Sequence, residues 1–159
     1  MCCNGVLFHI VKLGPDDSAK ELEALGMKLA RKKTEPYFKQ PCRFLSDCRC
    51  QIYEARPSRC RQFECRQLHL LAAREVAEEE VMQLIDEVKT RVAKVERLLR
   101  AEGNEAVELP LAERCAQVLE ERSGSDTREL AAAMTGLSGM LSRNFRVQRP
   151  SGLASAHEA

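Results

Sequence analysis

The chain has 159 residues, a formal net charge of +1, 44% hydrophobic residues and only 4% aromatic residues. Its length suits one domain with an appended helical region, and its near-neutral charge does not indicate a nucleic-acid or membrane partner. It lacks both the apolar run of roughly 18 residues that a membrane-spanning helix needs and the pattern of a signal peptide, so we expect a cytoplasmic protein without a membrane partner.

The N-terminal segment predicts a strand, a helix and a loop. Residues 6–13 are rich in β-branched and aromatic side chains and predict a short, mostly buried strand. Asp16, Asp17 and Ser18 follow it and are candidate N-caps for a helix over about 16–32. Residues 34–41 contain two prolines and are expected to form a loop.

Residues 42–65 hold five of the eight cysteines and show no sustained helix or strand period. We expect only a brief strand at Gln51–Tyr53 and a turn at Arg56–Ser58. A segment with so few apolar side chains needs another source of order, and several thiolates around one ion would supply it. In a reducing cytosol, clustered cysteines are more often metal ligands or redox groups than a disulfide framework, which is the alternative for a secreted protein.

Beyond about residue 66 the sequence predicts helices. In the first, hydrophobic residues step by 4, 3, 4, 3 and 4 positions, which is a heptad seam: Val81, Ile85, Val88, Val92, Val95 and Leu99. Gly103 should end this helix, and two more helices are expected over about 109–122 and 127–143. The seam predicts packing against these two helices, with a homodimer through the 81–99 helix as the alternative.

Thiolate sulfur binds zinc and iron, and four thiolates close a tetrahedral zinc site or hold an iron–sulfur cluster. The cysteine spacing here differs from the paired C-x2-C knuckles of common zinc fingers. Basic residues around the cysteines would offset the thiolate charge and lower the thiol pKa values: Lys39, Arg43, Arg49, Arg56, Arg59, Arg61 and Arg66. They could also contact nucleic-acid phosphates, but the intervening acidic residues favour charge compensation.

The run CQIYEARPSRCRQFEC, from Cys50 to Cys65, resembles the signature of the YkgJ-type cysteine-cluster family, C-x-I-Y-x-x-R-P-x-x-C-R-x-F-x-C, at every fixed position. Upstream, CCNG at residues 2–5 resembles the paired cysteines and glycine of that family, and Pro41-Cys42 resembles its middle cysteine. The resemblance covers about residues 2–70. These bacterial proteins carry a zinc- or iron-chelating domain, so the resemblance implies metal chelation.

Position by position, the resemblance implies six candidate ligands: Cys2, Cys3, Cys42, Cys50, Cys60 and Cys65. Cys48 has no counterpart in the signature. His69 could complete a site with three cysteines, but a surface position is favoured for it. Cys115 lies on the apolar face of a predicted helix and is expected to be a core residue. Family members usually carry one or two further cysteines before the pair. Either this branch lacks them or the true start lies upstream of Met1, and we expect the second.

We therefore predict a mainly α protein. An irregular cysteine-rich metal-binding domain with short strands should span 1–68, a three-helix region 69–145, and a flexible tail 146–159. The predicted function is metal chelation by clustered thiolates, with zinc as the ion of a structural site. The alternative is an iron or iron–sulfur dependent redox protein or enzyme of unknown substrate. A nucleic-acid-binding zinc module is the least favoured class.

Overall fold

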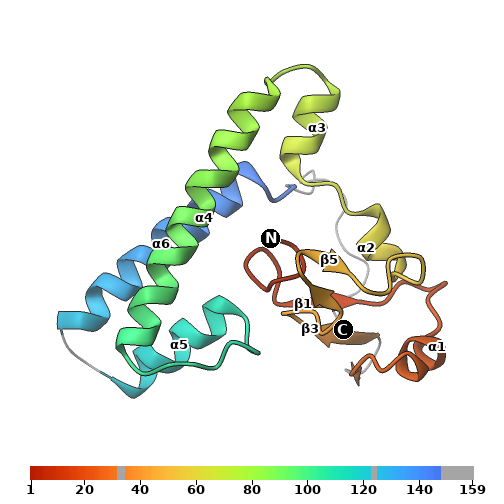
Figure 1. The fold of residues 1–159 in the computed structure, drawn as a ribbon, viewed down its shortest axis with the longest axis horizontal. Helices are drawn as coiled ribbons and strands as arrows, with labels where there is room; N and C mark the ends of the chain where they lie inside the picture. The colour runs from red at the N-terminus through yellow and green to blue at the C-terminus, as the bar shows by residue number, and fades with distance from the viewer. Residues whose placement is uncertain (32–34, 123–124, 148–159) are drawn as a thin grey trace, which may run out of the picture.

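The computed structural model describes residues 1–31, 35–122 and 125–147. The helices are α1 (Ala19–Ala24), α2 (Ser58–Gln62), α3 (Arg66–Ala72), α4 (Glu78–Ala101), α5 (Leu111–Glu121) and α6 (Ser125–Asn144). The strands are β1 (Ile10–Lys12), β2 (Ala30–Arg31), β3 (Pro36–Lys39), β4 (Leu45–Ser46) and β5 (Arg49–Cys50). Figure 1 shows α4 and α6 side by side, with the strands, α1 and α2 gathered away from them. The expected combination of helices and short strands is confirmed.

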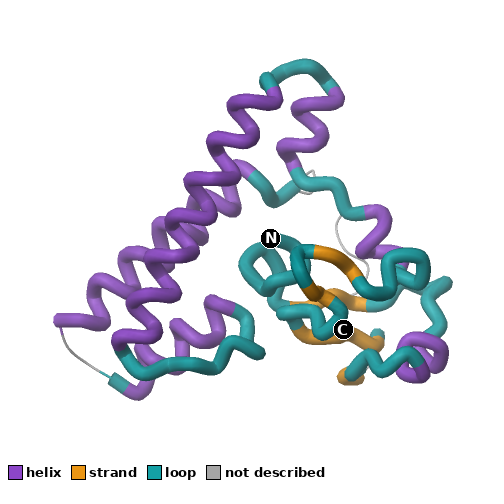
Figure 2. The backbone as a smooth tube through the Cα atoms, in the orientation of Figure 1, coloured by secondary structure: helices purple, strands orange, loops and turns teal. Residues whose placement is uncertain are grey.

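The first three strands form one antiparallel sheet in the order β1-β3-β2 (Figure 2). Val11 is opposite Phe38, and Ala30 is opposite Tyr37. The prediction of a loop over 34–41 is therefore wrong for β3. This strand forms because Phe38, only 4% exposed, is buried in a small hydrophobic cluster made of Leu13, Leu22, Met27 and Phe38.

Helix α1 is much shorter than the predicted helix over 16–32. The Ser18 hydroxyl accepts a hydrogen bond from the Glu21 N–H at 3.2 Å, which confirms Ser18 as the N-cap. Gly26 has φ +100°, a left-handed conformation that glycine adopts without a Cβ clash, and it turns the chain away from the helix axis. The residues after this turn are then free to pair as β2.

Strands β4 and β5 form a hairpin with Leu45 opposite Cys50 and Ser46 opposite Arg49. Asp47 and Cys48 form its two-residue turn, with φ values of 47° and 60°. Two consecutive positive φ values are typical of a type I′ turn, whose twist matches that of the flanking strands. The predicted strand over Gln51–Tyr53 is wrong, since those residues form turns that follow the hairpin.

The long helix, α4, begins at Glu78, within the acidic run expected at its front, and the separate short helix α3 that precedes it was not predicted. Helix α3 ends where Arg74 turns left-handed with φ 58°, and the Ala77 N–H then donates to the Glu80 carboxylate at 2.9 Å as α4 begins. Within the described residues, four helices therefore follow Cys65 where the prediction counted three. Gly103 ends α4 with φ 74°, as expected.

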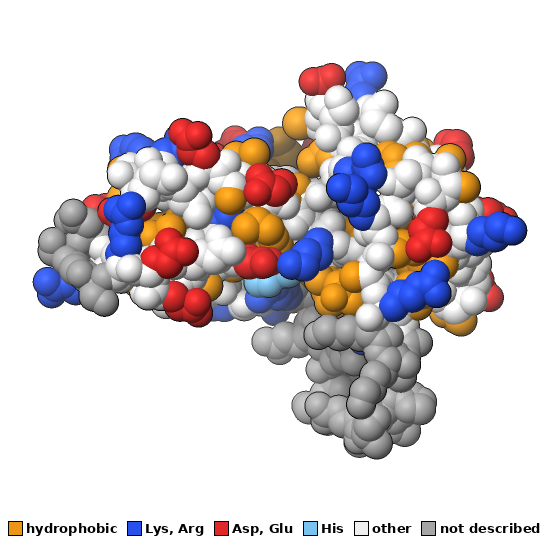
Figure 3. Space-filling model, turned by 90° about the horizontal axis from the view of Figure 1, so that it is seen from below, with side chains coloured by type: hydrophobic (Ala, Val, Ile, Leu, Met, Phe, Trp, Pro, Cys, Tyr) orange, Lys and Arg blue, Asp and Glu red, His pale blue; other side chains and the backbone are white. Residues whose placement is uncertain are grey.

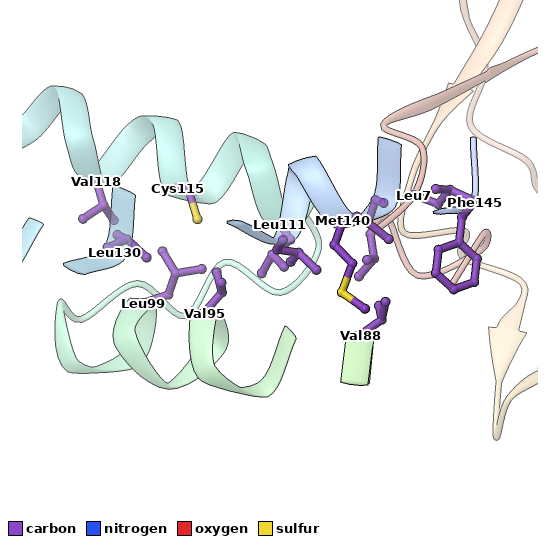
Figure 4. Close-up of a cluster of buried hydrophobic side chains, with 13 residues drawn as sticks. Leu7, Val88, Val95, Leu99, Leu111, Cys115, Val118, Leu130, Met140 and Phe145 are labelled. Carbon is purple, nitrogen blue, oxygen red and sulfur yellow. The ribbon is translucent and has the colours of Figure 1, made fainter. Parts of the chain in front are cut away.

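The heptad seam of α4 packs inside the chain. Val88, Val95 and Leu99 are 0% exposed and contact side chains of α5 and α6, as Figure 4 shows. Cys115 of α5 is 1% exposed within the same cluster, so it is a core residue as predicted. A homodimer through α4 would need a face other than the seam.

The N-terminal residues join this helical core. Val6 and Leu7 belong to the buried cluster, but their N–H groups donate to Asn4 and Met1 in the N-terminal turn, so the predicted strand over 6–13 is reduced to β1. The Arg146 guanidinium donates to the Leu7 carbonyl at 3.2 Å, and the Arg66 N–H donates to the Phe145 carbonyl at 3.1 Å. Residues 148–159 of the expected tail lie outside the described residues.

Charges of both signs are interspersed over the face that Figure 3 displays. This distribution agrees with the net charge of +1. None of the described helices combines the length and the apolar character needed to cross a membrane.

Candidate metal centre

Four of the six candidate ligands come from four separate segments. Cys3 lies in the N-terminal turn, and Cys42 follows β3 and the cis Gln40–Pro41 bond. Cys50 ends β5, and Cys60 lies in α2. All four are partly buried. The Cys42 N–H donates to the Cys3 carbonyl at 2.7 Å, so the first two segments are joined directly.

The thiols of these four residues, here called the tetrad, lie close enough to affect one another electrostatically. Burial, with smaller contributions from the neighbouring Cys3, Cys42 and Cys50, raises the pKa of Cys60 to about 12. Burial also raises the pKa of Cys42, with a smaller contribution in the same direction from Cys3 and Cys50. The pKa of Cys3 is raised by burial first and by Cys50 second. Each member of the tetrad is thus a neighbour of the other three.

The two remaining candidates, Cys2 and Cys65, form a pair beside the tetrad. Burial raises the pKa of Cys2, and the thiols of Cys3 and Cys65 act in the same direction, whereas the N-terminal ammonium opposes them. Both side chains pack against the helical core. The structure therefore brings all six candidates into one region, with Cys2 linking the pair to the tetrad.

Cys48 and His69 are placed differently. Cys48 is exposed at the tip of the β4–β5 hairpin. The exposed His69 side chain has its Nδ1 atom 3.6 Å from the Glu64 carboxylate. Neither residue contributes to the pKa shifts of the tetrad.

The expectation that basic residues lower the thiol pKa values is wrong for the buried cysteines. Arg56 does act in that direction on Cys3 and Cys60, but burial outweighs it. The Arg56 Nε donates to the Tyr53 carbonyl at 2.9 Å, and its guanidinium carbon lies 3.6 Å from the centre of the Tyr53 ring. Two other basic side chains form ion pairs elsewhere, Lys39 with Glu113 at 3.3 Å and Arg59 with Glu35 at 3.9 Å.

Asp17 positions the helix that carries Cys60, a role that the sequence did not suggest. Helix α2 has no side-chain cap of its own. Instead the Asp17 carboxylate accepts hydrogen bonds from the Ser58 N–H at 2.7 Å, the Ser58 hydroxyl at 3.0 Å and the Gly14 N–H at 2.7 Å. A Cβ at Gly14 would collide with the Ser58 hydroxyl, so glycine permits this approach. In the sequence, Asp17 resembled a cap for its own helix.

Gly5 fixes the segment that carries Cys3. Its φ is +78°, and a Cβ there would lie 3.3 Å from both the Pro41 nitrogen and the Pro110 Cα. This close approach places the N-terminal turn against the residue that precedes Cys42. The Asn4-Gly5 dipeptide is a common turn signal from which this turn could have been predicted.

The donor set suits zinc or iron. Partly buried cysteine sulfurs are soft ligands, which these metals accept and which magnesium or calcium disfavour. Within the described ranges, no three His, Cys, Asp or Glu side chains already surround a common metal position. The tetrad thiols are therefore neighbours that do not yet converge on one point. Four thiolates alone would repel one another, so a bound cation would be needed to hold the four sulfur atoms together.

Comparison with known proteins agrees with this donor chemistry. Residues 1–84, more than half of the 159-residue chain, match the CxxCxxCC family, whose description is "putative zinc- or iron-chelating domain". No curated protein and no solved structure matches the chain. The family resemblance predicted from the Cys50–Cys65 signature is confirmed. The chain belongs to the CxxCxxCC family.

Proposed function

We propose that this protein is a cytoplasmic metal chelator whose tetrad holds one ion, with Cys2 and Cys65 as an adjoining pair of candidate ligands. The observation that carries the proposal is the mutual proximity of four thiols from four segments. Zinc is the ion proposed for a structural role, because four thiolates close its tetrahedral coordination. The eight cysteines are all unpaired, the state that a reducing cytoplasm maintains.

Such an ion would stabilise a part of the chain that has little apolar material of its own. The hydrophobic cluster beside the tetrad has four buried members, and Cys42 and Cys60 pack against it. Structural zinc contributes on the order of 10 kcal/mol to the folding of small peptide sites. Metal binding requires deprotonated thiols, so the raised pKa values of Cys42 and Cys60 mean that metal affinity falls as the pH falls.

An iron or iron–sulfur redox protein is the second candidate. The observation that favours it is the Cys2–Cys65 pair, because six neighbouring thiols exceed what one tetrahedral ion requires. Cys2 and Cys65 would then be ligands of a second metal ion or of an iron–sulfur cluster.

Purification under anaerobic conditions allows the two candidate functions to be distinguished. Elemental analysis, acid-labile sulfide and the visible spectrum would be measured on the full chain. A colourless protein with about one equivalent of zinc per chain supports the structural site. A brown protein with iron and sulfide supports the redox candidate. Protein with neither metal after expression in medium supplied with both would contradict chelation.

Replacement of a tetrad cysteine tests the ligand assignment. Cys60→Ser should lose most of its metal, because serine does not replace a soft thiolate. Cys48→Ser is the matched control, since Cys48 is exposed at the hairpin tip, and it should keep its metal. Cobalt substitution gives a second readout, because thiolate-to-cobalt absorption should weaken only in Cys60→Ser. An unchanged metal-to-protein ratio in Cys60→Ser would refute the assignment.

A further inference from the structure

A cavity of about 270 Å³ lies beside the tetrad and is not explained by metal chelation. Three segments form its walls: the turn after α1, the end of β3, and the loop that follows β3. The Arg43 guanidinium donates to the Gly26 carbonyl and so ties the first and last of these segments together. The cavity is slightly smaller than the ligand pockets of roughly 300–1,000 Å³ that hold drug-sized molecules, so only a small occupant would fit.

The wall of the cavity is part apolar and part polar, and four of its side chains are apolar. Met27 is 5% exposed and Phe38 is 4% exposed, and Pro41 and Phe44 complete the apolar walls. A methionine sulfur and aromatic rings make favourable contacts with a flat or branched apolar body. The Cys42 side chain also lines the cavity, so an occupant would lie against one member of the tetrad.

The charged side chains that line the cavity are all cations: Lys28, Lys39 and Arg43. Lys39 is paired with Glu113 at 3.3 Å, and Arg43 bonds to a backbone carbonyl. The Lys28 side chain is exposed and makes none of the ion pairs found among the described residues. A partly apolar cavity with such a rim is complementary to an anion that carries an apolar group.

We propose that this cavity binds a small organic anion, with a carboxylate, sulfonate or phosphate group at the cationic rim and an apolar body against Met27 and Phe38. Lys28 is the residue that would contact the anionic group most directly, because Lys39 already has a carboxylate partner. The cavity walls other than Cys42 contain no proposed metal ligand. This proposal therefore goes beyond metal chelation and does not depend on which metal the tetrad holds.

Titration of the metal-loaded, isotope-labelled full chain with 2-naphthoate, followed by NMR, tests the proposal. Chemical-shift changes should be saturable and concentrated at residues 26–28 and 38–44. The neutral analogue 2-naphthylmethanol should bind about tenfold more weakly, because it lacks the charge that the rim recognises. Equal binding of the two probes, or shifts scattered over the molecule, would overturn the proposal.

Two charge reversals sharpen the test. Lys28→Glu should weaken 2-naphthoate binding by about tenfold or more. Lys20→Glu makes the same change of net charge at an exposed position of α1 outside the cavity and should bind like the wild type. Equal weakening in both variants would mean non-specific attraction and would refute a site. Metal content and thermal midpoint are measured on each sample, and Lys28→Met replaces Lys28→Glu if the latter does not fold.

Discussion

At the scale of single residues, a candidate metal centre depends on side chains that are not ligands. Asp17 joins the N-terminal part of the chain to α2, because its carboxylate accepts two hydrogen bonds from Ser58. Burial would raise the pKa of Asp17, but hydrogen bonds from Gly14 and Ser58 and the charge of Arg61 outweigh it and lower that pKa. The ionised form of Asp17 is therefore the one that stabilises the fold.

Replacement of Asp17 by alanine should destabilise the protein at neutral pH. We expect a loss of about 1–2 kcal/mol in the free energy of unfolding, the usual effect of removing a helix cap. Because the folded pKa of Asp17 lies below its ordinary value of 3.8, the stabilisation is complete above that value and is lost as the pH falls through the folded pKa. The difference between wild type and Asp17→Ala, measured by urea unfolding, should therefore shrink below about pH 4.

Asp16→Ala is the matched control for this measurement. Asp16 is the exposed neighbour of Asp17, and its substitution should change stability by less than about 0.5 kcal/mol. An equal effect of the two substitutions, or a difference that persists in acid, would show that the hydrogen bonds to α2 are not the cause.

At the scale of elements, α4 is the helix on which the helical core is built. Its seam is buried against α5 and α6, and it is bounded by the left-handed Arg74 before it and by Gly103 after it. The seam was evident in the sequence because the hydrophobic spacing repeats over three turns or more. The break before α4 was not evident in the sequence, since arginine seldom adopts a positive φ and so did not signal a turn at Arg74.

Substitution of a residue in the seam should lower the free energy of unfolding far more than substitution of a residue beside the seam. Leu99→Ala should lower the free energy of unfolding by about 2–5 kcal/mol, because Leu99 is 0% exposed and its removal leaves a cavity. Met82→Ala, on the same helix but at a residue that is 48% exposed, should cost less than about 1 kcal/mol. Urea unfolding followed by circular dichroism would measure both. Similar losses in the two variants would contradict the assignment of the seam to the core.

At the scale of the whole molecule, the cysteine-rich part and the helical part share residues. Leu7 lies in the helical core although it is four positions from Cys3, and Cys65 packs against that core as it begins α3. A metal ion held by the tetrad would therefore bind segments whose two ends, near Leu7 and Cys65, already pack against the helical core.

Removal of the metal should loosen the two parts unequally. Amides of α2 and of the β4–β5 hairpin should exchange faster with deuterium after treatment with a chelator, because none of the five α2 residues is buried. Amides of α4 and α6 should keep their protection, since their contacts do not involve the tetrad. Hydrogen exchange with mass spectrometry would measure this, and uniform loss of protection would show that the ion stabilises the entire chain.

The sequence by itself determined the chemistry of the site and the helical character of the chain. Cysteine is read directly as a soft ligand, the Cys50–Cys65 signature identified the family, and the hydrophobic period of α4 identified its buried face. These features are local, since they depend on residue type and on spacing along one segment.

The tertiary structure alone decided which thiols meet. Cys3, Cys42, Cys50 and Cys60 become neighbours through the backbone bond between Cys3 and Cys42, the hairpin that ends at Cys50, and the Asp17 contact that holds α2. The β3 strand and the cavity beside Cys42 likewise arise from packing around Phe38. These contacts join residues far apart in the chain, so no local pattern of propensity or spacing records them.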